Sequence, residues 1–222
     1  MNKLNHVAFI MDGNGRWGIK RNKGRNFGHL KGVETVKKIV KDSIKLNIPI
    51  VTFYVFSSEN WKRPKKEVNF LFKLIKNYFT NEIKNILEQG IKINILGEMN
   101  KLPPDIKLTL KKTIFLTSKN KKIQVNLAIN YGSKNEILNA FKKNKKEKNI
   151  KNFEKNLYTK SMPNPDILIR TGGHQRLSNF MLWQLAYSEL FFLKKLWPDF
   201  NSKDLKIVIN KFKKSQRNFG SI

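Results

Sequence analysis

The sequence contains no cysteine, which excludes disulfide bonds and thiolate metal sites. No apolar run reaches the ~18–20 residues that a membrane-spanning helix requires, and the amino terminus lacks a signal-peptide pattern. We therefore expect a soluble, cytoplasmic protein. With 222 residues, 40% hydrophobic content, no internal repeat and no linker, the chain is expected to form a single domain over residues 1–222.

Acidic residues are scarce, with 16 Asp and Glu against 45 Lys and Arg and a formal net charge of +29. Such a charge favours nucleic acid through counterion release, or anionic lipid headgroups, where each lysine near the surface adds roughly 1 kcal/mol. Lysine runs such as 142–151 alternate with asparagine and contain few aromatic residues, which is typical of a solvated surface. We favour this last interpretation, with peripheral contact at the inner face of a membrane as an alternative.

Arginine is rare, and its positions are informative. Only seven of the 45 basic residues are arginines, and six of these fall in the segments 6–25, 56–64 and 170–179. A guanidinium group binds phosphate through two parallel hydrogen bonds, which the ammonium group of lysine cannot form. The sequence therefore predicts a phosphate or diphosphate site assembled from three distant segments.

Five apolar or β-branched segments have the nearly continuous hydrophobic character of strands that are covered on both faces. The predicted strands are 7–11, 50–56, 91–96, 123–129 and 167–169, and the predicted helices are 28–46, 65–88, 104–117 and 134–144. This alternation predicts an α/β fold with a mainly parallel central sheet flanked by helices. Because ligands bind beyond the carboxyl ends of parallel strands, the three arginine segments should meet at one edge of the sheet.

The first arginine segment places Asp12 and a glycine-rich turn, residues 13–16, directly after a strand. Glycines allow backbone N–H groups to approach an anion closely, and a carboxylate there suits Mg²⁺, which prefers one or two carboxylates with phosphate oxygens. The alternative is that Asp12 caps a helix. A G-x-G-x-x-G pattern spans residues 13–18, but the acidic residue that a dinucleotide-binding fold requires is missing at the end of the second strand.

The other two arginine segments also join polar groups to the ends of strands. The second offers hydrogen bonds from Ser57 and Asn60, a phosphate contact from Arg63 and a flat apolar wall from Trp61. The third brings two arginines, two glycines and a hydroxyl group into residues 170–179. Both segments have the composition of an anion pocket.

Two apolar stretches leave alternatives open. Glu189 lies in an apolar run, where it is either a metal ligand or a structural carboxylate satisfied by hydrogen bonds. Residues 68–87 of the helix predicted over 65–88 are apolar on most sides, which indicates either deep burial or the wall of a tunnel for a hydrocarbon chain.

Together, residues 7–17, 56–64 and 166–183 resemble the cis-prenyltransferases, and most closely the bacterial undecaprenyl diphosphate synthases. The resemblance runs nearly end to end and includes residues 28–29 and 197–200. It implies a homodimeric, Mg²⁺-dependent transferase of the cis-prenyl synthase fold, with an apolar tunnel. Such enzymes condense isopentenyl diphosphate repeatedly onto farnesyl diphosphate with cis double bonds, here giving a long polyprenyl diphosphate, undecaprenyl in particular, as carrier lipid for cell-wall glycans.

The resemblance also implies roles for individual residues. Asp12 and Asn60 are expected at the catalytic centre, and Asp12 and Glu189 are the expected metal ligands. The turn at 13–16 would face the allylic diphosphate, whereas the 170–179 segment would bind isopentenyl diphosphate. The expected substrate-binding residues are Gly13, Asn14, Gly15, Arg16, Trp17, Arg25, His29, Ser57, Glu59, Trp61, Arg63, Arg170, Arg176 and Ser178.

Three positions depart from the family pattern: His174 replaces a glutamate, Gln175 a histidine found in some members, and Asn218 a second arginine of the tail. The last two bear on the second metal ligand and on a contact across the dimer. One alternative function is a noncatalytic subunit of the family, against which the retained aspartate and arginines argue. The other is a nucleic-acid-binding protein, which predicts tight, salt-sensitive binding to DNA.

Overall fold

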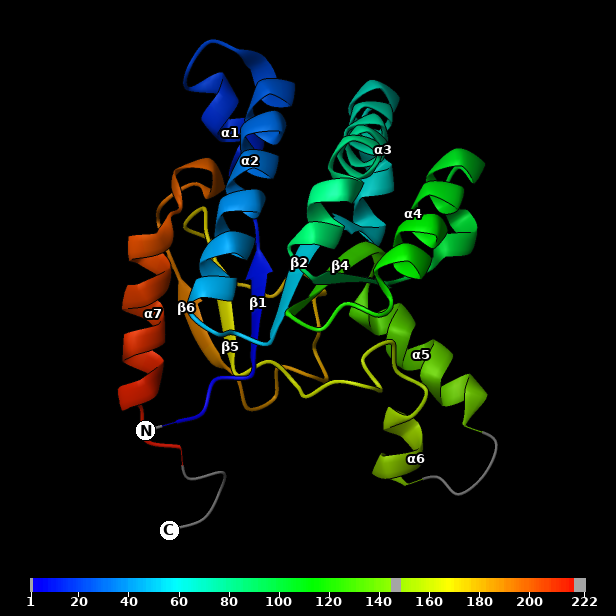
Figure 1. Cartoon of the computed structure of the whole chain (residues 1–222), viewed down its shortest axis with the longest axis vertical. Coiled ribbons are helices and arrows are strands. Elements are labelled where there is room, and N and C mark those ends of the chain that lie inside the picture. Colours follow the sequence, from blue (N-terminus) through cyan, green and yellow to red (C-terminus); the bar gives the residue numbers. More distant parts are fainter. Residues whose placement is uncertain (1, 145–148, 218–222) are drawn as a thin grey trace.

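The computed structural model describes residues 2–144 and 149–217, and it is built around a six-stranded sheet (Figure 1). All strand pairs are parallel, in the order β3-β4-β2-β1-β5-β6. The strands are β1 (His6–Ile10), β2 (Ile50–Ser57), β3 (Ile91–Leu96), β4 (Ile123–Tyr131), β5 (Ile167–Arg170) and β6 (Glu189–Phe192). The α-helices are α1 (Asn14–Ile19), α2 (Gly24–Lys45), α3 (Lys65–Glu88), α4 (Pro104–Thr117), α5 (Ser133–Lys143), α6 (Ile150–Glu154) and α7 (Ser202–Lys214).

The predicted α/β class with a parallel central sheet is confirmed, and the five predicted strands are present. The sequence did not predict β6, which has only four residues and pairs with β5 alone. It also did not predict α1, α6 or α7. Two of the six residues of α1 are glycines, which have a low helix propensity.

Aromatic packing joins the sheet to the helices that follow it. Phe9 of β1 and Phe53 of β2 stack with their ring centroids 5.0 Å apart, and Trp197 lies edge-on to both. Nε1 of Trp197 donates a hydrogen bond of 2.9 Å to the carbonyl of Gly32 in α2. This fully enclosed cluster fixes α2 and the 197–199 turn against the sheet.

The sheet interior also contains a polar chain. The buried ring of His6 has Nδ1 2.8 Å from the carbonyl of Pro163 and Nε2 2.7 Å from Oγ1 of Thr52. Nδ2 of Asn126 donates to the same Thr52 oxygen at 2.9 Å. Strands β1, β2 and β4 are thus cross-linked by side chains as well as by the backbone, which favours one register.

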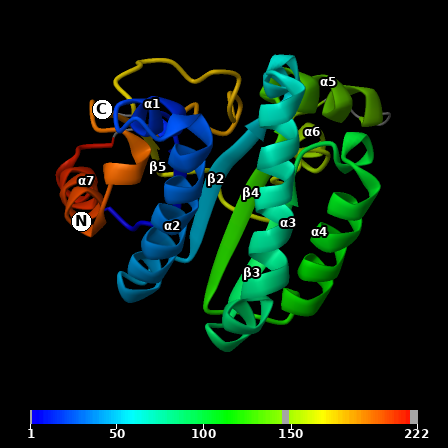
Figure 2. The same cartoon turned by 90° about the horizontal axis from the view of Figure 1, so that it is seen from above.

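The strand order determines where polar loops can meet. Because β1 lies between β2 and β5, the residues that follow these three strands share one edge of the sheet. Helices α2 and α3 contact each other, and β2 and β4 are visible between them in Figure 2. Among the described residues, no helix has the length and hydropathy needed to cross a membrane.

Candidate active site

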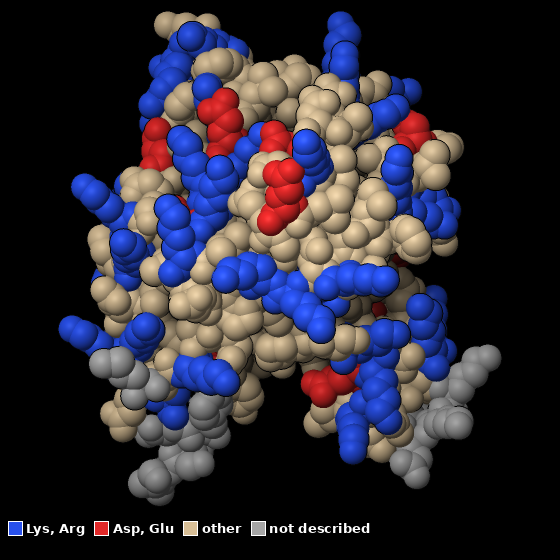
Figure 3. All heavy atoms as spheres, viewed as in Figure 1, with Lys and Arg blue, Asp and Glu red and all other residues tan. Residues whose placement is uncertain are grey.

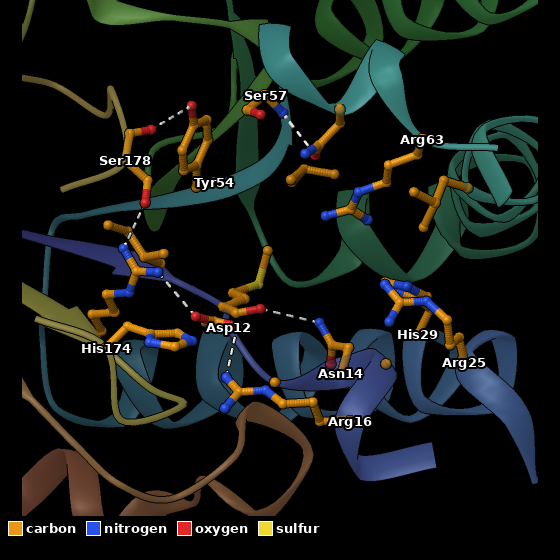
Figure 4. A pocket seen from close by; sticks show the side chains of 18 of the residues that line it. Asp12, Asn14, Arg16, Arg25, His29, Tyr54, Ser57, Arg63, His174 and Ser178 are labelled. Atoms are coloured by element: carbon orange, nitrogen blue, oxygen red, sulfur yellow. Dashed lines mark hydrogen bonds and ion pairs between the residues drawn. The ribbon is translucent and has the colours of Figure 1, made fainter. Parts of the chain in front are cut away.

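A cavity of about 380 Å³ opens at the carboxyl ends of β1, β2 and β5 (Figure 4). All three arginine segments contribute to it, as the sequence predicts. Its lining consists of Ile10, Met11, Asp12, Gly13, Asn14, Gly15, Arg16, Arg25, His29, Tyr54, Val55, Ser57, Asn60, Arg63, Leu71, Arg170, His174, Arg176 and Ser178.

Asp12 lies at the centre of this lining, between two arginines. Its Oδ1 accepts a hydrogen bond of 3.1 Å from Arg16, and its Oδ2 accepts one of 2.9 Å from Arg170 (Figure 4). Arg170 is only 4% exposed, so its charge depends on Asp12 for compensation. Asp12 does not cap α1, whose N-cap is Gly13 without a side-chain bond. The capping interpretation is therefore wrong.

Two glycines let the backbone pass close to this carboxylate. Gly172 has φ +89°, and a Cβ atom there would lie 2.6 Å from Nη2 of Arg16 and 3.0 Å from Cγ of Asp12. Gly13 has φ +112°, and its Cβ would lie 2.7 Å from Leu196. Both turns need glycine for its backbone conformation and for space.

A second group of cations converges on one carboxylate, that of Glu67 in α3. Arg25 donates two hydrogen bonds of 3.1 Å to it, and Arg63 donates one of 3.0 Å. Nε2 of His29 lies 3.5 Å from the same carboxylate. A Cβ on Gly15 would lie 2.8 Å from Cζ of Arg25, so the guanidinium lies directly against the glycine turn. Glu67 of α3 therefore holds Arg25 and His29 of α2 together with Arg63 beside the cavity.

This cluster sets the ionisation of its own members. Burial alone would raise the pKa of Glu67, but the hydrogen bonds and charges of Arg25 and Arg63 lower it overall. Burial, followed by the charge of Arg63, lowers the pKa of His29 to about 4. At neutral pH the site thus contains an ionised Glu67, two arginines and an uncharged imidazole.

Two histidines give stability a predictable dependence on pH. Burial lowers the pKa of both His6 and His29 to about 4, whereas the ordinary value is 6.5. Between these values the unfolded chain binds protons that the folded chain excludes, so the free energy of unfolding should fall as the pH decreases from about 6.5 to about 4. Urea unfolding across this range should show a shallower fall for His29→Gln. An unchanged slope would contradict a buried, neutral His29.

Polar groups from β2 and from the segment after β5 complete the rim. Oδ1 of Asn60 accepts a hydrogen bond of 3.1 Å from the backbone N–H of Ser57. The Tyr54 hydroxyl donates to the carbonyl of Ser178 at 3.3 Å, and burial raises the pKa of Tyr54, which keeps it a donor. Ser178 itself has φ +51°, and its Oγ accepts from Arg170 at 2.8 Å. The loop is therefore held in an unusual conformation by the site arginine.

Trp17, an expected substrate-binding residue, lies outside the cavity lining. Its Nε1 donates to Oδ1 of Asp199 at 2.7 Å, and its ring stacks on Phe27 with centroids 5.8 Å apart. The guanidinium of Arg21 also lies over the ring of Trp17, with its Cζ 3.7 Å from the ring centroid. In this structure Trp17 fastens α1 to its neighbours.

Trp61 and Glu59 also lie outside the lining, on the short 3₁₀ helix Ser58–Lys62. Nε1 of Trp61 donates to Oδ1 of Asn130 at 2.8 Å, which ties this helix to β4. Glu59 accepts a hydrogen bond of 2.7 Å from Asn179. Trp61 thus connects the 3₁₀ helix to β4, and Glu59 connects it to the segment that follows β5.

Glu189 is not brought together with Asp12. It begins β6 opposite Ile167, at the amino end of the sheet, whereas Arg170 and the Asp12 carboxylate mark the carboxyl end. Three residues of strand separate these levels, about 10 Å. Within residues 2–144 and 149–217, no group of three or more His, Asp and Glu side chains is placed to hold a metal ion.

The three departures from the family pattern fall in different places. His174 lines the cavity (Figure 4), whereas the side chain of Gln175 is exposed and outside the lining. Asn218 lies outside the described residues. The replacement at His174 therefore adds an imidazole to the site.

The sequence reasoning missed Glu67 and Tyr54. A signal for Glu67 was present, because it follows Arg63 by four residues, the spacing of a helical ion pair. Tyr54 lies inside an apolar strand, where nothing in the sequence distinguishes its hydroxyl from a core tyrosine. Its contact with Ser178 appears only in the folded chain.

An apolar cavity of about 110 Å³ adjoins the polar one, between α2 and α3. The two share Met11, Asn14, His29, Val55 and Leu71 as lining residues. The apolar part continues along Gly32, Val33, Val36, Leu74, Ile75, Tyr78, Phe79, Leu127 and Trp197. A ligand with an anionic head and an apolar tail would match this pair of cavities.

Comparison with known proteins agrees with this geometry. The family model described as "Putative undecaprenyl diphosphate synthase" matches residues 10–220. The isoprenyl transferase of Rickettsia typhi is 43% identical over 99% of both chains, and that of Clostridium perfringens is 42% identical over 98% of this chain and 90% of its own.

Two solved structures share the fold. Lavandulyl diphosphate synthase from Lavandula x intermedia, in complex with dimethylallyl diphosphate, has a TM-score of 0.93 at 32% identity over 98% of both chains. A probable undecaprenyl diphosphate synthase from Campylobacter jejuni has a TM-score of 0.86 at 31% identity over the full length of both. The chain therefore belongs to the undecaprenyl diphosphate synthase family of prenyltransferases.

Proposed function

We propose that this prenyltransferase condenses isopentenyl diphosphate onto farnesyl diphosphate in repeated cis additions. The observation that carries the proposal is the cavity in which Asp12, five cationic side chains and a connected apolar space meet. In each cycle the bond between the allylic carbon and its diphosphate breaks, the isopentenyl double bond attacks that carbon, and a proton is lost. A site for this reaction must hold two diphosphates and stabilise the one that leaves.

The allylic diphosphate fits the side of the cavity formed by α1, α2 and Arg63. Arg16, Arg25 and Arg63 supply donors there, and the glycine turn leaves backbone space beside them. Neutral His29 offers a further hydrogen bond without adding charge. The complex of the lavender enzyme with dimethylallyl diphosphate supports an allylic diphosphate as one substrate of this fold.

Isopentenyl diphosphate fits the side formed after β5. Arg176 lines this part, and its backbone carbonyl accepts a hydrogen bond from Arg170, which also holds Ser178. The buried Arg170 thus positions the loop, and the more exposed Arg176 is free to follow a ligand. Ser57 and Asn60 would lie between the two diphosphates.

Arg176→Lys should raise the KM for isopentenyl diphosphate about tenfold, because the ammonium group cannot make the paired contacts of a guanidinium. The Kd for farnesyl diphosphate should remain within about twofold. Steady-state kinetics and calorimetry would measure the two values. Arg21→Lys, outside the cavity, is the matched control. Equal losses for both substrates would disprove the assignment to two pockets.

Of the two expected Mg²⁺ ligands, Asp12 and Glu189, only Asp12 lies in this site. The carboxylate is one-quarter exposed and faces the cavity, and Mg²⁺ commonly takes one carboxylate together with phosphate oxygens. When bound, the ion would help neutralise the leaving diphosphate. Asp12 would have to exchange at least one of its arginine contacts for this role, and Glu189 would not share it within the same chain.

The hydrocarbon tail would enter the apolar space between α2 and α3. Leu74, Ile75 and Tyr78 of α3 already line its start. Longer products require the apolar cavity to extend into the tunnel that the family resemblance implies, and we include this tunnel in the proposal. We also propose that the protein forms a homodimer and that its product serves as a carrier lipid for the cell wall.

Glu67→Gln should lower kcat about tenfold without weakening the binding of inorganic pyrophosphate. The substitution removes an anion that competes with pyrophosphate for Arg25 and Arg63, but both arginines also lose the charged partner that orients them. Calorimetry and steady-state kinetics would separate the two effects. Glu34→Gln, which removes an exposed ion pair with Lys31, is the control. Weaker pyrophosphate binding with unchanged kcat would contradict the positioning role.

The decisive experiment incubates the purified protein with farnesyl diphosphate, labelled isopentenyl diphosphate and Mg²⁺. A ladder of products that ends near undecaprenyl and disappears with chelator would support reaction, metal and product together. A folded protein without incorporation would favour the noncatalytic subunit. Figure 3 shows many Lys and Arg side chains on one face of the molecule, and tight, salt-sensitive binding to DNA without incorporation would favour the nucleic-acid-binding alternative.

A further inference from the structure

Helix α4 displays apolar side chains on the side that faces solvent. Phe115 is 78% exposed and Leu108 is 70% exposed, the two highest values among the large apolar side chains that the structure describes. Their spacing of seven residues places them two turns apart on one face. The opposite face packs on the protein through Ile106, Leu110, Thr113 and Thr117. The outer pair is therefore not part of the core.

Lysines flank this pair. Lys111 and Lys112 lie three or four residues from both Leu108 and Phe115, so the four side chains form one ridge, which we call the α4 ridge. Neither lysine forms an ion pair with any residue in the described ranges. Residues 101–122 contain seven lysines and one acidic residue, Asp105, which is paired with Lys76 of α3 at 2.8 Å. The ridge is thus apolar at its tip and cationic around it.

We propose that the α4 ridge docks the protein on an anionic lipid bilayer. Apolar tips among lysines match a bilayer surface, where the side chains enter the boundary region and the ammonium groups meet lipid phosphates. A nucleic acid offers phosphates but no apolar layer for Leu108 and Phe115. A second copy of this strongly basic chain would oppose lysine with lysine.

The location of the ridge separates it from the candidate active site. Both views place α4 at the outer side of the molecule, beyond α3 (Figures 1 and 2). No residue of α4 lines either site cavity. Docking and catalysis therefore use different residues, and the failure of one proposal leaves the other intact.

The test is cosedimentation of the full chain with vesicles of phosphatidylcholine, with and without phosphatidylglycerol. Lys111→Gln combined with Phe115→Ser should weaken binding to the anionic vesicles about tenfold. The matched control is Ile207→Ser with Lys211→Gln on α7, which also removes one exposed apolar residue and one lysine four positions apart. This control should change binding less than about twofold. Circular dichroism and the unfolding midpoint verify that both variants fold.

A second variant reports on depth. Phe115→Trp should show fluorescence quenching by brominated lipid in anionic vesicles, as expected for a side chain below the headgroups. Equal losses of vesicle binding for the α4 and α7 variants would show that binding depends only on the overall positive charge, and would overturn the proposal. The proposal would also be overturned if brominated lipid did not quench the tryptophan at position 115. The same holds if the α4 variant formed a smaller oligomer with unchanged vesicle binding, or if it lost only its binding to DNA.

Discussion

Asp12→Asn is expected to lower kcat about a thousandfold, while the Kd for farnesyl diphosphate changes less than about threefold. Asparagine keeps the shape of the side chain and removes the charge. The substitution therefore slows the step in which charge develops on the leaving diphosphate, and it changes the affinity for the bound ground state only a little. Single-turnover kinetics and equilibrium binding would measure the two quantities.

The control for this change is Asp199→Asn. Asp199 also accepts a hydrogen bond from an arginine, Arg21, but lies outside the cavity lining. Asp12→Asn also leaves the buried Arg170 without its full counter-charge, so urea unfolding is needed to separate stability from turnover. Equal and modest losses of turnover and binding would exclude a role for Asp12 in departure of the diphosphate.

Gly28→Ala is expected to lower the free energy of unfolding by about 3 kcal/mol and to abolish diphosphate binding. A Cβ at this position of α2 would lie 1.8 Å from the carbonyl oxygen of Asn14, which is a backbone atom of α1. A few tenths of an ångström of adjustment cannot relieve such an overlap. Helix α1 must move, and the turn that carries Arg16 moves with it.

Gly24→Ala supplies the comparison. Gly24 has φ +70° and no atom within 4 Å of its Cβ position, so alanine there costs only backbone strain, about 1 kcal/mol. Denaturant unfolding of both variants and pyrophosphate calorimetry would give the difference. If the two variants lost equal stability, close packing of α1 on α2 would not be what holds the glycine turn in place.

The sheet and the meeting of the arginine segments could be predicted, because both follow from local patterns. Apolar runs predict the strands, and parallel strands bring the segments that follow them to one edge. The partners of individual side chains could not be predicted in this way. Trp17 was expected to contact the substrate and Trp61 to form a flat apolar wall, whereas in the structure the indole N–H of Trp17 donates to Asp199 and that of Trp61 donates to Asn130. Glu189 begins a strand too short for its pattern to fix the register.

The position of β1 between β2 and β5 has a consequence for synthesis of the chain. β1 can pair with β2 once residue 57 has left the ribosome, but its other edge has no partner until residues 167–170 follow. For more than a hundred residues of translation, this apolar strand presents an unpaired edge, which invites pairing with other chains. Arg170, the ion-pair partner of Asp12, is also synthesised only with β5. A nascent chain stopped before β5 should therefore depend on chaperones and bind no diphosphate.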